Sequence, residues 1–540
     1  MLRALMLGAG LSAGAGVMAG QALAQDTAAP AQADAPPDAS AAPRRVDINE
    51  YFVEGNTVLS DPEIEQAVYP FLGPDKTLDD VEKARTALQK VYEAKGLKTV
   101  FVEIPQQNVV GGRVRLAVSE AKVGQVTVAG AKHTADRTIT QALPSATPGK
   151  VPDLNQFSNE LVALNSRSAD RQVTPELKPG ATPGTVDVAL NVEDKLALHG
   201  GLEVSNNYSR DTTKTRLQAN LRYDDLWGAG HSVSGFYAVA PERPDDSEVY
   251  VASYGLPLSQ KLRLDVTALK SNSDVATVGD TNVLGNGQSA TAVFTRVLGG
   301  GASGGGGGLY QRLTASLAWK DFKEDTRFGD VSSKAPITYY PVSLGWAGTL
   351  TQDKSQLGFD LSTTFALRGL GSNPDDFDFK RYRATGGFAY VHASVNDRID
   401  LPKGLQVYAS LEGQLASEPL ISNEQISAGG AGSVRGFLQS EAIGDNGLLT
   451  SLELRSPVIA QGGLLDELRV HAFVDAARVW ILDPLPEQDR HTSLLGIGVG
   501  LRVKLMGRVS GDVDVGSAFD DAGTTKVGDT RVHLRLSTDF

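Results

Sequence analysis

The sequence predicts a membrane β-barrel of about sixteen antiparallel strands, preceded by two small α/β domains. Three observations carry this prediction. The first residues have the pattern of an export signal, and residues 45–195 repeat one order of strands and helices. Residues 196–540 alternate apolar and polar side chains over segments of roughly ten residues, as a bilayer-crossing strand requires, whereas soluble strands average about 5–6 residues.

Composition narrows the classes of protein to which the chain can belong. The formal net charge is −13, which argues against a nucleic-acid binder, whose surface would be basic. The absence of cysteine excludes a disulfide scaffold, a thiolate metal site and a cysteine nucleophile. Glycine accounts for 58 of 540 residues, roughly 11% against a usual ~7%, and this excess favours β structure with many turns.

Residues 1–24 are predicted to be a secretory signal peptide, with a glycine-rich anchor helix as the alternative. Arg3 is the lone positive charge, an apolar stretch follows, and Ala22-Leu23-Ala24 has the small-x-small pattern of a cleavage site. No later stretch reaches the ~18 consecutive apolar residues of a transmembrane helix. Residues 25–44 are mainly Ala, Pro, Asp and Ser, so we expect a disordered linker.

Residues 45–120 predict the order strand, helix, helix, strand, strand. Ser60 precedes Asp61-Pro62-Glu63, which is an N-cap followed by proline and acids in the first helical turn. Thr77 and Asp80 have the spacing of a capping box. Residues 121–195 repeat this order less cleanly, and two tandem units of one order indicate a repeated module.

Residues 196–540 have no convincing helical pattern. Leu217, for example, begins an apolar stripe that continues at every second residue to Tyr223, opposite a polar face. Only a closed barrel lets β structure cross lipid without unpaired backbone groups. Sixteen strands give roughly 22 residues per strand and connection, although fourteen fit nearly as well. The charged face is expected to line a hydrated lumen, while the low aromatic content of 6% counts mildly against a barrel.

One glycine-rich segment interrupts the alternation. It contains Val434, Arg435, Gly436 and Phe437, in a stretch of about twenty residues before the next strand. A loop folded into the polar lumen would bury Arg435, which would then need a carboxylate partner, and Asp475 is a candidate. An ordinary surface loop with a solvated arginine explains the pattern equally well.

With these features in order, the sequence resembles the two-partner secretion transporters, the outer-membrane TpsB proteins of the FhaC, ShlB and HecB type. The resemblance covers the chain after the linker. The matching motifs are Asn165, Arg171, Pro179-Gly180 and Gly184 in the second module, Tyr208, Asp225, Gly228 and Gly230 in the first barrel hairpin, Val434-Arg435-Gly436-Phe437, and Phe473 with Asp475. Each motif alone is weak, whereas their order and spacing are specific.

The resemblance implies that residues 45–120 and 121–195 are POTRA domains, which in the family capture unfolded cargo in the periplasm. It implies that Val434–Phe437 form the lumen-inserted sixth extracellular loop and that Asp475, in a strand motif beginning at Phe473, receives Arg435. The aromatic Phe540 would be read by the barrel-assembly machinery. The chain would then reside in outer-membrane lipid, with its N-terminal domains in the periplasm.

Departures from the family pattern concern packing and plugging. The family's strand motif ends in glycine where this chain has Ala477, so the packing of the loop is expected to differ. Some members of the family plug the pore with an N-terminal helix. The composition of residues 25–44 does not favour such a helix. The run Gly299–Gly308 is expected to be a flexible loop.

Enzymatic and metal sites are not expected, nor is a cofactor. Gly301-Ala302-Ser303-Gly304-Gly305 fits the G-x-S-x-G pattern, yet it lies in a polyglycine run instead of a strand-to-helix turn. The seven histidines lack a metal-binding spacing. An outer-membrane esterase is therefore excluded mainly by the missing serine turn.

The predicted function is export of an unfolded partner protein, expected to be a large β-helical exoprotein, to the cell surface. Assembly or insertion of other outer-membrane proteins is the alternative within the same superfamily. Two modules instead of about five argue against it. A ligand-gated or diffusion porin is a third class, and it would not need the periplasmic modules. Nucleic acid is not an expected partner.

Overall fold

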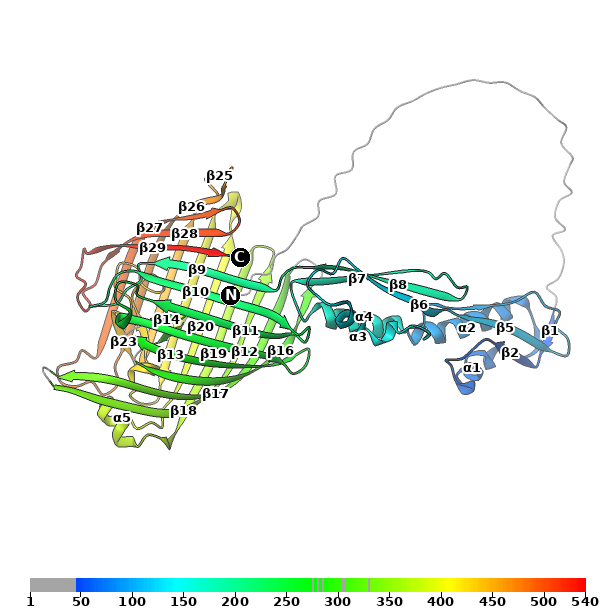
Figure 1. Cartoon of the computed structure of the whole chain (residues 1–540), viewed down its shortest axis with the longest axis horizontal. Coiled ribbons are helices and arrows are strands. Elements are labelled where there is room, and N and C mark those ends of the chain that lie inside the picture. Colours follow the sequence, from blue (N-terminus) through cyan, green and yellow to red (C-terminus); the bar gives the residue numbers. More distant parts are fainter. Residues whose placement is uncertain (1–44, 274–275, 279–280, 284–285, 304–306, 329–330) are drawn as a thin grey trace, which may run out of the picture. The chain divides into compact units, whose positions relative to one another are not determined.

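The computed structural model describes residues 45–540 except 274–275, 279–280, 284–285, 304–306 and 329–330 (Figure 1). The predicted signal peptide and linker, residues 1–44, lie outside the described residues. The chain forms two compact units. One extends to Val91 and includes Val102–Val118, and the other comprises Tyr92–Phe101 and Ser119–Phe540.

The first α/β domain contains the predicted order of strand, helix, helix, strand and strand, with a short additional strand, β3, between the two helices. Its elements are β1 (Val46–Ile48), β2 (Glu50–Glu54), α1 (Asp61–Val68), η1 (Tyr69–Phe71), β3 (Gly73–Lys76), α2 (Leu78–Ala94), β4 (Val100–Glu103) and β5 (Arg113–Glu120). The main sheet has the order β2-β5-β4. A capping box between Ser60 and Glu63 starts α1, because each side chain satisfies a backbone N–H that the helix leaves unpaired.

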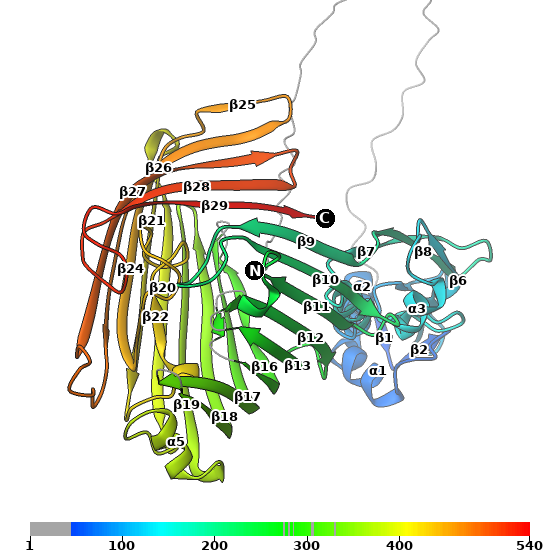
Figure 2. The same ribbon diagram turned by 60° about the vertical axis from the view of Figure 1, so that its left-hand side comes forward.

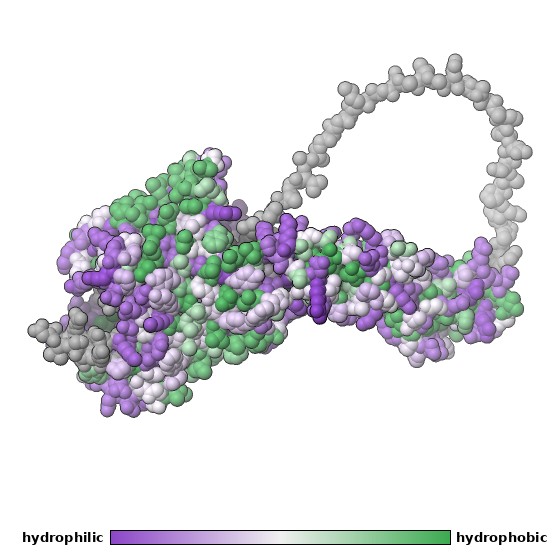
Figure 3. All heavy atoms as spheres, viewed as in Figure 1, coloured by the Kyte–Doolittle hydropathy of each residue, from purple (hydrophilic) through white to green (hydrophobic). Residues whose placement is uncertain are grey.

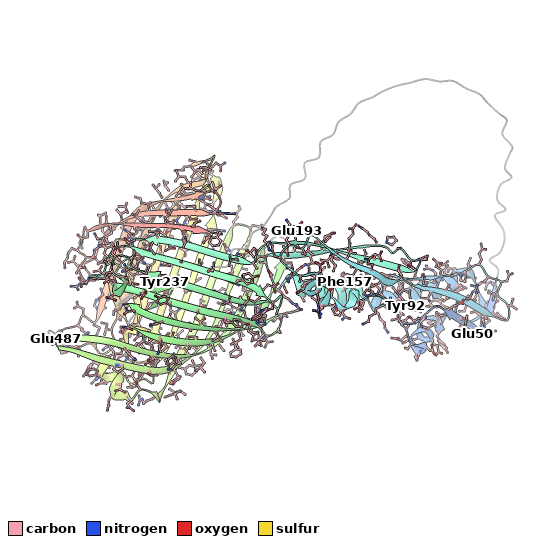
Figure 4. The ribbon with its side chains drawn as sticks, in the orientation of Figure 1. Glu50, Tyr92, Phe157, Glu193, Tyr237 and Glu487 are labelled. Carbon is pink, nitrogen blue, oxygen red and sulfur yellow. The ribbon has the colours of Figure 1, made fainter. Side chains whose placement is uncertain are left out.

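The second α/β domain repeats this order. Its elements are β6 (Lys122–Ala129), α3 (Asp136–Gln141), η2 (Pro144–Ala146), α4 (Leu154–Asn165), β7 (Arg171–Pro179) and β8 (Thr185–Asp194). The sheet order is β6-β8-β7. Asp153 caps α4 by accepting the N–H groups of Asn155 and Gln156. The apolar face of α4 places Phe157 in the domain core, as Figure 4 shows.

Sixteen antiparallel strands close into a barrel in the described part of the chain, as predicted. They are β9 (Leu198–Ser205), β10 (Arg216–Leu226), β11 (His231–Val239), β12 (Ser247–Pro257), β13 (Leu262–Ser273), β16 (Gly287–Ser303), β17 (Gly307–Phe328), β18 (Val331–Gln352), β19 (Ser355–Gly371), β20 (Ala389–Asp400), β21 (Gln406–Ala416), β24 (Asn446–Arg455), β26 (Leu465–Trp480), β27 (His491–Leu505), β28 (Val509–Ala518) and β29 (Thr530–Asp539).

Short elements occupy the connections between these strands. They are η3 (Pro244–Asp246), β14 (Ala276–Val278), β15 (Thr281–Val283), α5 (Pro374–Lys380), η4 (Pro402–Gly404), η5 (Ser422–Glu424), β22 (Ile426–Ala428), β23 (Ala442–Gly444) and β25 (Ala460–Gly462). Within the described residues, none of the helices combines the length and the apolar character needed to cross a membrane.

The barrel wall separates apolar from polar side chains, as the alternation predicts. Leu217 and Leu221 of β10 are exposed on the outside, whereas the neighbouring Arg216 is buried. On β29, Leu534 and Leu536 are exposed and His533 is buried. Figure 3 shows patches of hydrophobic residues, in green, over the barrel strands. The outer face therefore suits lipid, and the inner face is left for polar contacts.

The described residues of the glycine run, 299–303 and 307–308, form strands and are not the flexible loop that the sequence predicts. β16 continues to Ser303 and β17 begins at Gly307, and Gly300 pairs with Tyr310 across this hairpin. Residues 304–306 lie outside the described residues. Pairing with a long neighbouring strand overrides the weak strand preference of glycine, because the backbone of any residue except proline can join a ladder. Ser303 therefore lies at the end of a strand.

The barrel closes at a seam between its first and last strands. β9 and β29 pair from Gly201 opposite Asp539 to Ser205 opposite Arg535. Beyond this ladder, the side chain of Asn206 accepts the N–H of Leu534 at 2.7 Å. The backbone N–H groups of Phe540 and Gly200 donate to each other's carbonyl oxygens at 2.9 and 3.1 Å. The seam thus joins residues more than 300 positions apart.

Candidate functional site

The glycine-rich segment forms the tip of a hairpin inside the barrel. β22 and β23 pair antiparallel, with Ala428 opposite Ala442, and the chain between them turns at Gly429 and Gly430, whose φ angles are +111° and +93°. Glycine adopts such angles without the steric penalty of a side chain. Figure 2 shows β22 within the ring of barrel strands. The segment is therefore buried in the lumen, unlike a solvated surface loop.

Arg435 lies in this lumen loop with 6% of its side chain exposed. Its Nε donates to Oδ2 of Asp475 on β26 at 2.7 Å, and its Nη2 donates to Oδ1 at 2.9 Å. The backbone N–H of Arg435 donates to the same carboxylate at 3.1 Å. The flat guanidinium matches the two carboxylate oxygens, a geometry that the point charge of lysine cannot reproduce.

Two further carboxylates face Arg435. Glu453 of β24 accepts from its Nη1 at 2.8 Å, and Asp514 of β28 lies 3.4 Å from the same nitrogen. Glu453 also pairs with Arg455 at 2.7 Å and with Arg502 at 3.1 Å. Three arginines thus meet four carboxylates, because Arg502 also pairs with Asp512 at 3.2 Å. Because removing one member of a buried pair costs about 3–5 kcal/mol, this charged cluster fixes the loop to the wall.

An aromatic ring supports the guanidinium from one side. The Cζ atom of Arg435 lies 3.5 Å from the centre of the Phe473 ring, and that side chain is buried. Phe473 and Asp475 are alternate residues of β26, so both side chains point into the lumen. Cation–π attraction is stronger where water is excluded, which is the case here.

Apolar side chains anchor the loop on either side of Arg435. Val434 and Phe437 are fully buried in one cluster, which also contains Ala477. The cluster further comprises Ile426, Ala428, Ala442, Leu449, Val479, Leu494, Ala518 and Ala522. Ala477, which departs from the family glycine, therefore contributes to the packing of this loop.

A glycine-lined face of β27 makes room for the loop. The alternating residues are Gly496, Gly498 and Gly500. A Cβ atom at Gly496 would lie 2.0 Å from the carbonyl oxygen of Arg435, and one at Gly498 would lie 2.3 Å from the Phe473 ring. Because neither distance is possible for real atoms, any other residue at these positions would displace the loop or the ring.

The loop backbone also contacts the last two strands. The N–H of Gly436 donates to Nε2 of His533 at 3.0 Å, so this histidine is neutral and accepts through Nε2. Gly436 has a φ of +102°, and a Cβ there would lie 3.1 Å from the carbonyl carbon of Ser517. Glu441 accepts the N–H of Thr524 at 2.9 Å, which ties the loop to the β28–β29 connection.

A second set of contacts holds the outer connections together. The buried Asp445 accepts the N–H of Leu420 at 2.8 Å and that of Leu482 at 2.7 Å. Its carboxylate also lies 3.4 Å from Arg381. These residues belong to three different connections, because Leu420 precedes β22, Leu482 follows β26 and Arg381 follows α5. Asp445 therefore links three connections between barrel strands at one point.

Phe540, predicted to be an assembly signal, lies at the seam. A Cβ at Gly200 would lie 2.4 Å from its Cζ, so the ring covers the glycine of the first strand. Sequence reasoning missed Glu453, Asp514, His533 and the glycine face of β27. The signal for the glycine face was present, because glycine at every second position of a strand leaves a flat inner surface.

The chain matches one protein family over most of its length. The profile described as haemolysin secretion/activation protein ShlB/FhaC/HecB matches residues 184–503, and the profile of the ShlB-type POTRA domain matches residues 46–121. The outer membrane transporter CdiB of Dickeya dadantii is 23% identical over 459 residues, which cover 80% of this chain and 76% of that protein.

Other relatives and solved structures match a similar share of the chain. The heme/hemopexin transporter protein HuxB of Haemophilus influenzae strain 86-028NP is 20% identical, covering 84% of this chain and 77% of that protein. CdiB from Escherichia coli has a TM-score of 0.57 at 19% identity, covering 94% of this chain and 93% of that structure. BamA from Haemophilus ducreyi, lacking POTRA domains 1–3, has a TM-score of 0.52 at 14% identity, covering 92% and 100%.

The structural likenesses, at these identities, show a shared fold. The family profile matches residues 184–503, which is more than half of the chain and includes the lumen loop and its partner strand. The chain therefore belongs to the haemolysin secretion/activation protein family, ShlB/FhaC/HecB.

Proposed function

We propose that this protein exports an unfolded partner protein from the periplasm to the cell surface by two-partner secretion. It resides in the outer membrane, with the α/β domains in the periplasm. The α/β domains capture the partner, and the barrel lumen conducts it. The periplasm holds no ATP, so folding of the partner outside the cell supplies direction. We expect no enzymatic activity and no cofactor.

The observation that carries the proposal is the buried charged cluster around Arg435. A closed barrel with a polar lumen could be a simple pore, which needs no loop fixed inside it. Here the loop is held by a bidentate pair with Asp475 and by the buried Phe437. We infer that Val434–Phe437 keep the lumen in the arrangement that admits cargo, with Arg435 fixed by Asp475 and Phe473.

Removal of the arginine side chain tests this role. We expect Arg435→Ala to assemble a heat-modifiable barrel that no longer secretes its partner, because the buried Asp475 is left without the guanidinium that neutralises it. Arg210→Ala is the matched control, since Arg210 lies exposed in the first extracellular connection. Normal secretion by Arg435→Ala would overturn the role of the loop.

Cargo capture is proposed to occur by β-augmentation, in which an extended segment adds a strand to a sheet edge. In the second α/β domain the two edges differ. The side chain of Asn165 accepts the N–H of Val173 on β7 at 2.8 Å and donates to its carbonyl at 3.0 Å. Pro175 and Pro179 have no N–H, so the β7 edge offers few donors.

The other edge, β6, is the proposed docking strand. It contains no proline, and from Val126 to Ala129 it pairs with β8 on one side only within the described part of the chain. The chain has no cysteine, so any cross-link formed by an introduced cysteine can be assigned to the position of that cysteine. We expect Thr127→Cys on β6 to cross-link to cargo during export and Thr174→Cys on β7 to do so much less. Equal cross-linking would exclude a preference for β6.

The partner is proposed to be a large β-helical exoprotein. Relatives are named as an outer membrane transporter and as a heme/hemopexin transporter protein. The barrel-assembly machinery is proposed to recognise the last strand with Phe540. A chain that instead inserted other barrels would cause loss of many outer-membrane proteins on depletion, whereas an exporter would cause loss of one surface protein.

A further inference from the structure

The first periplasmic turn of the barrel has a rigid, preformed shape. It connects β10 to β11, and Asp225, Trp227, Gly228 and Gly230 all have positive φ angles between 55° and 75°. The Asp225 carboxylate accepts the N–H of Gly230 at 2.7 Å and so closes the turn. Because its own side chain holds the turn, the turn keeps one conformation toward the residues that pack against it.

A buried ion pair joins this turn to the second α/β domain. Nη1 of Arg171, the first residue of β7, lies 2.5 Å from Oδ2 of Asp225. The two side chains are only 2% and 9% exposed. Nη2 of Arg171 donates to the carbonyl of Leu164 at the end of α4 at 3.0 Å. The arginine therefore links the helix, the sheet and the barrel turn.

The backbone of the turn lies directly on the domain surface. A Cβ at Gly228 would lie 2.3 Å from Cγ2 of Thr138 on α3. A Cβ at Gly230 would lie 3.7 Å from Cβ of Arg167, which follows α4. Glycine is the residue that lets two backbones approach this closely. The contact therefore includes both helices of the domain.

The residues next to the ion pair form a second polar contact. Nε2 of His199 on β9 lies 2.8 Å from Asp170 and 3.8 Å from Asp224 of β10. Asp224 is also paired with Arg222 at 2.8 Å. Asp170 and Arg171 of the domain thus meet His199 and Asp225 of the barrel. Two neighbouring pairs resist rotation better than one.

We propose that Arg171 is a positioning residue that holds the second α/β domain in one fixed orientation against the barrel throughout export. The inference rests on the proposed function, because its purpose is to present cargo held on β6 to the mouth of the lumen. Opening the contact would leave Asp225 and Arg171 without their charged partners while both remain partly buried. An unpaired buried charge costs free energy. The joint therefore stays closed while cargo passes.

Replacing the ion pair with a covalent bond tests whether holding is the function of Arg171. The Cβ positions of residues 167 and 230, 3.7 Å apart, suit a disulfide. We expect Arg171→Ala to lower secretion at least tenfold while leaving a heat-modifiable barrel. Adding Arg167→Cys and Gly230→Cys should restore secretion to within about threefold of wild type when oxidised, and reductant should remove the rescue.

Control variants distinguish loss of this joint from misfolding of the second α/β domain and from failure of the proposed export function. The single variant Gly230→Cys reports the strain of a side chain at that position, and Arg167→Cys reports the loss of that arginine. Arg137→Ala, at an exposed arginine of α3, should secrete normally. An otherwise wild-type chain locked by the disulfide should also secrete. Loss of secretion on locking, or normal secretion by Arg171→Ala, would overturn the fixed joint. A wild-type chain that exports no partner would overturn the proposed function instead.

Discussion

Arg171 and Arg435 are both buried arginines of this chain, and they are bound in different ways. Arg171 meets one carboxylate and one backbone carbonyl, and within the described residues its Nε has no hydrogen-bond partner. Arg435 meets three carboxylates, and its Nε, Nη1 and Nη2 all donate hydrogen bonds. The first arrangement is a joint between two bodies, and the second is the centre of a network.

The difference shows how a buried charge is matched to its surroundings. At the periplasmic joint, one arginine and one aspartate neutralise each other, and close backbone contact supplies the remaining fit. In the lumen, Arg435 shares Glu453 with two other arginines, so each charge has more than one partner. Removing one member of the network leaves several charged side chains with fewer partners. Removing one member of the Arg171–Asp225 pair leaves one charged side chain without its partner.

The largest effect is expected from Asp475→Ala. It removes the bidentate partner of Arg435 and leaves the guanidinium buried beside Phe473, at a cost of about 3–5 kcal/mol to the placement of the loop. Protease accessibility of the loop in assembled protein measures this placement, together with secretion. Asp265→Ala is the matched control, because Asp265 pairs with Arg263 on β13, outside the network around Arg435. A loop that stays protected in Asp475→Ala would show that the network does not fix it.

Lysine substitutions compare the two arginines directly. Arg435→Lys keeps the charge but loses the bidentate geometry, so we expect secretion to fall at least about tenfold per assembled barrel. Arg171→Lys keeps the contact with one carboxylate and loses the bond to the Leu164 carbonyl, so we expect a fall of only about threefold. Equal losses would mean that geometry matters equally at both sites. The assembled fraction, measured by heat-modifiability, normalises both values.

A methyl group on β27 should disturb the lumen without changing any charge. Gly496→Ala places a Cβ against the carbonyl of Arg435, where backbone atoms cannot simply move aside. We expect destabilisation of about 1–3 kcal/mol, read as faster proteolysis of the loop and a lower unfolding temperature. Gly235→Ala on β11 is the control, since its Cβ would meet nothing within 4 Å. Identical stability of the two variants would contradict the tight fit.

The smallest effect is expected next to the joint, at Asp194. Partial burial alone would raise the pKa of this carboxyl, but the N–H groups of Lys132, His133 and Thr134 outweigh it and hold the pKa below its usual value. Because the folded pKa is the lower one, its stabilisation is present above about pH 4 and is lost as the pH falls further. Asp194→Asn should therefore weaken the loop before α3 by about 1 kcal/mol at neutral pH.

Amide exchange of residues 132–134 measures this effect in the full-length protein. At pH 7 the variant should exchange roughly fivefold faster than wild type, which is the equivalent of about 1 kcal/mol. Below about pH 4 the two should converge, since the wild-type carboxyl becomes protonated. A difference that persists at low pH would assign the stabilisation to the shape of the side chain instead of its charge.

The barrel and the two α/β domains could be predicted because local patterns encode them. Alternation along β10 and β29 specifies strands with one apolar face, and Ser60 and Thr77 mark helix starts. The flexible-loop prediction was wrong for residues 299–303 and 307–308, because pairing between β16 and β17, and not local composition, determines the backbone there.

The lumen site was only partly predictable. Arg435 and Asp475 were candidates from the composition of the loop, the family resemblance added Phe473, and the structure brings the three into contact. Glu453, Asp514 and His533 were missed, because each looks like an ordinary inward residue of its strand. Their meeting depends on how strands β24, β28 and β29 are placed around the barrel, which no single segment encodes. The joint at Arg171 was missed for the same reason.

The seam between β9 and β29 has a consequence for how the barrel forms. Its ladder joins Ser205 to Arg535, so it is among the contacts with the greatest sequence separation in the molecule. Local hairpins form early because their loops are short, whereas closing this ladder must await nearly the whole sheet. Until then the growing sheet has two open edges, which can pair with other chains and aggregate. The Phe540 ring over Gly200 would therefore be the last contact made, and the one that ends this exposure.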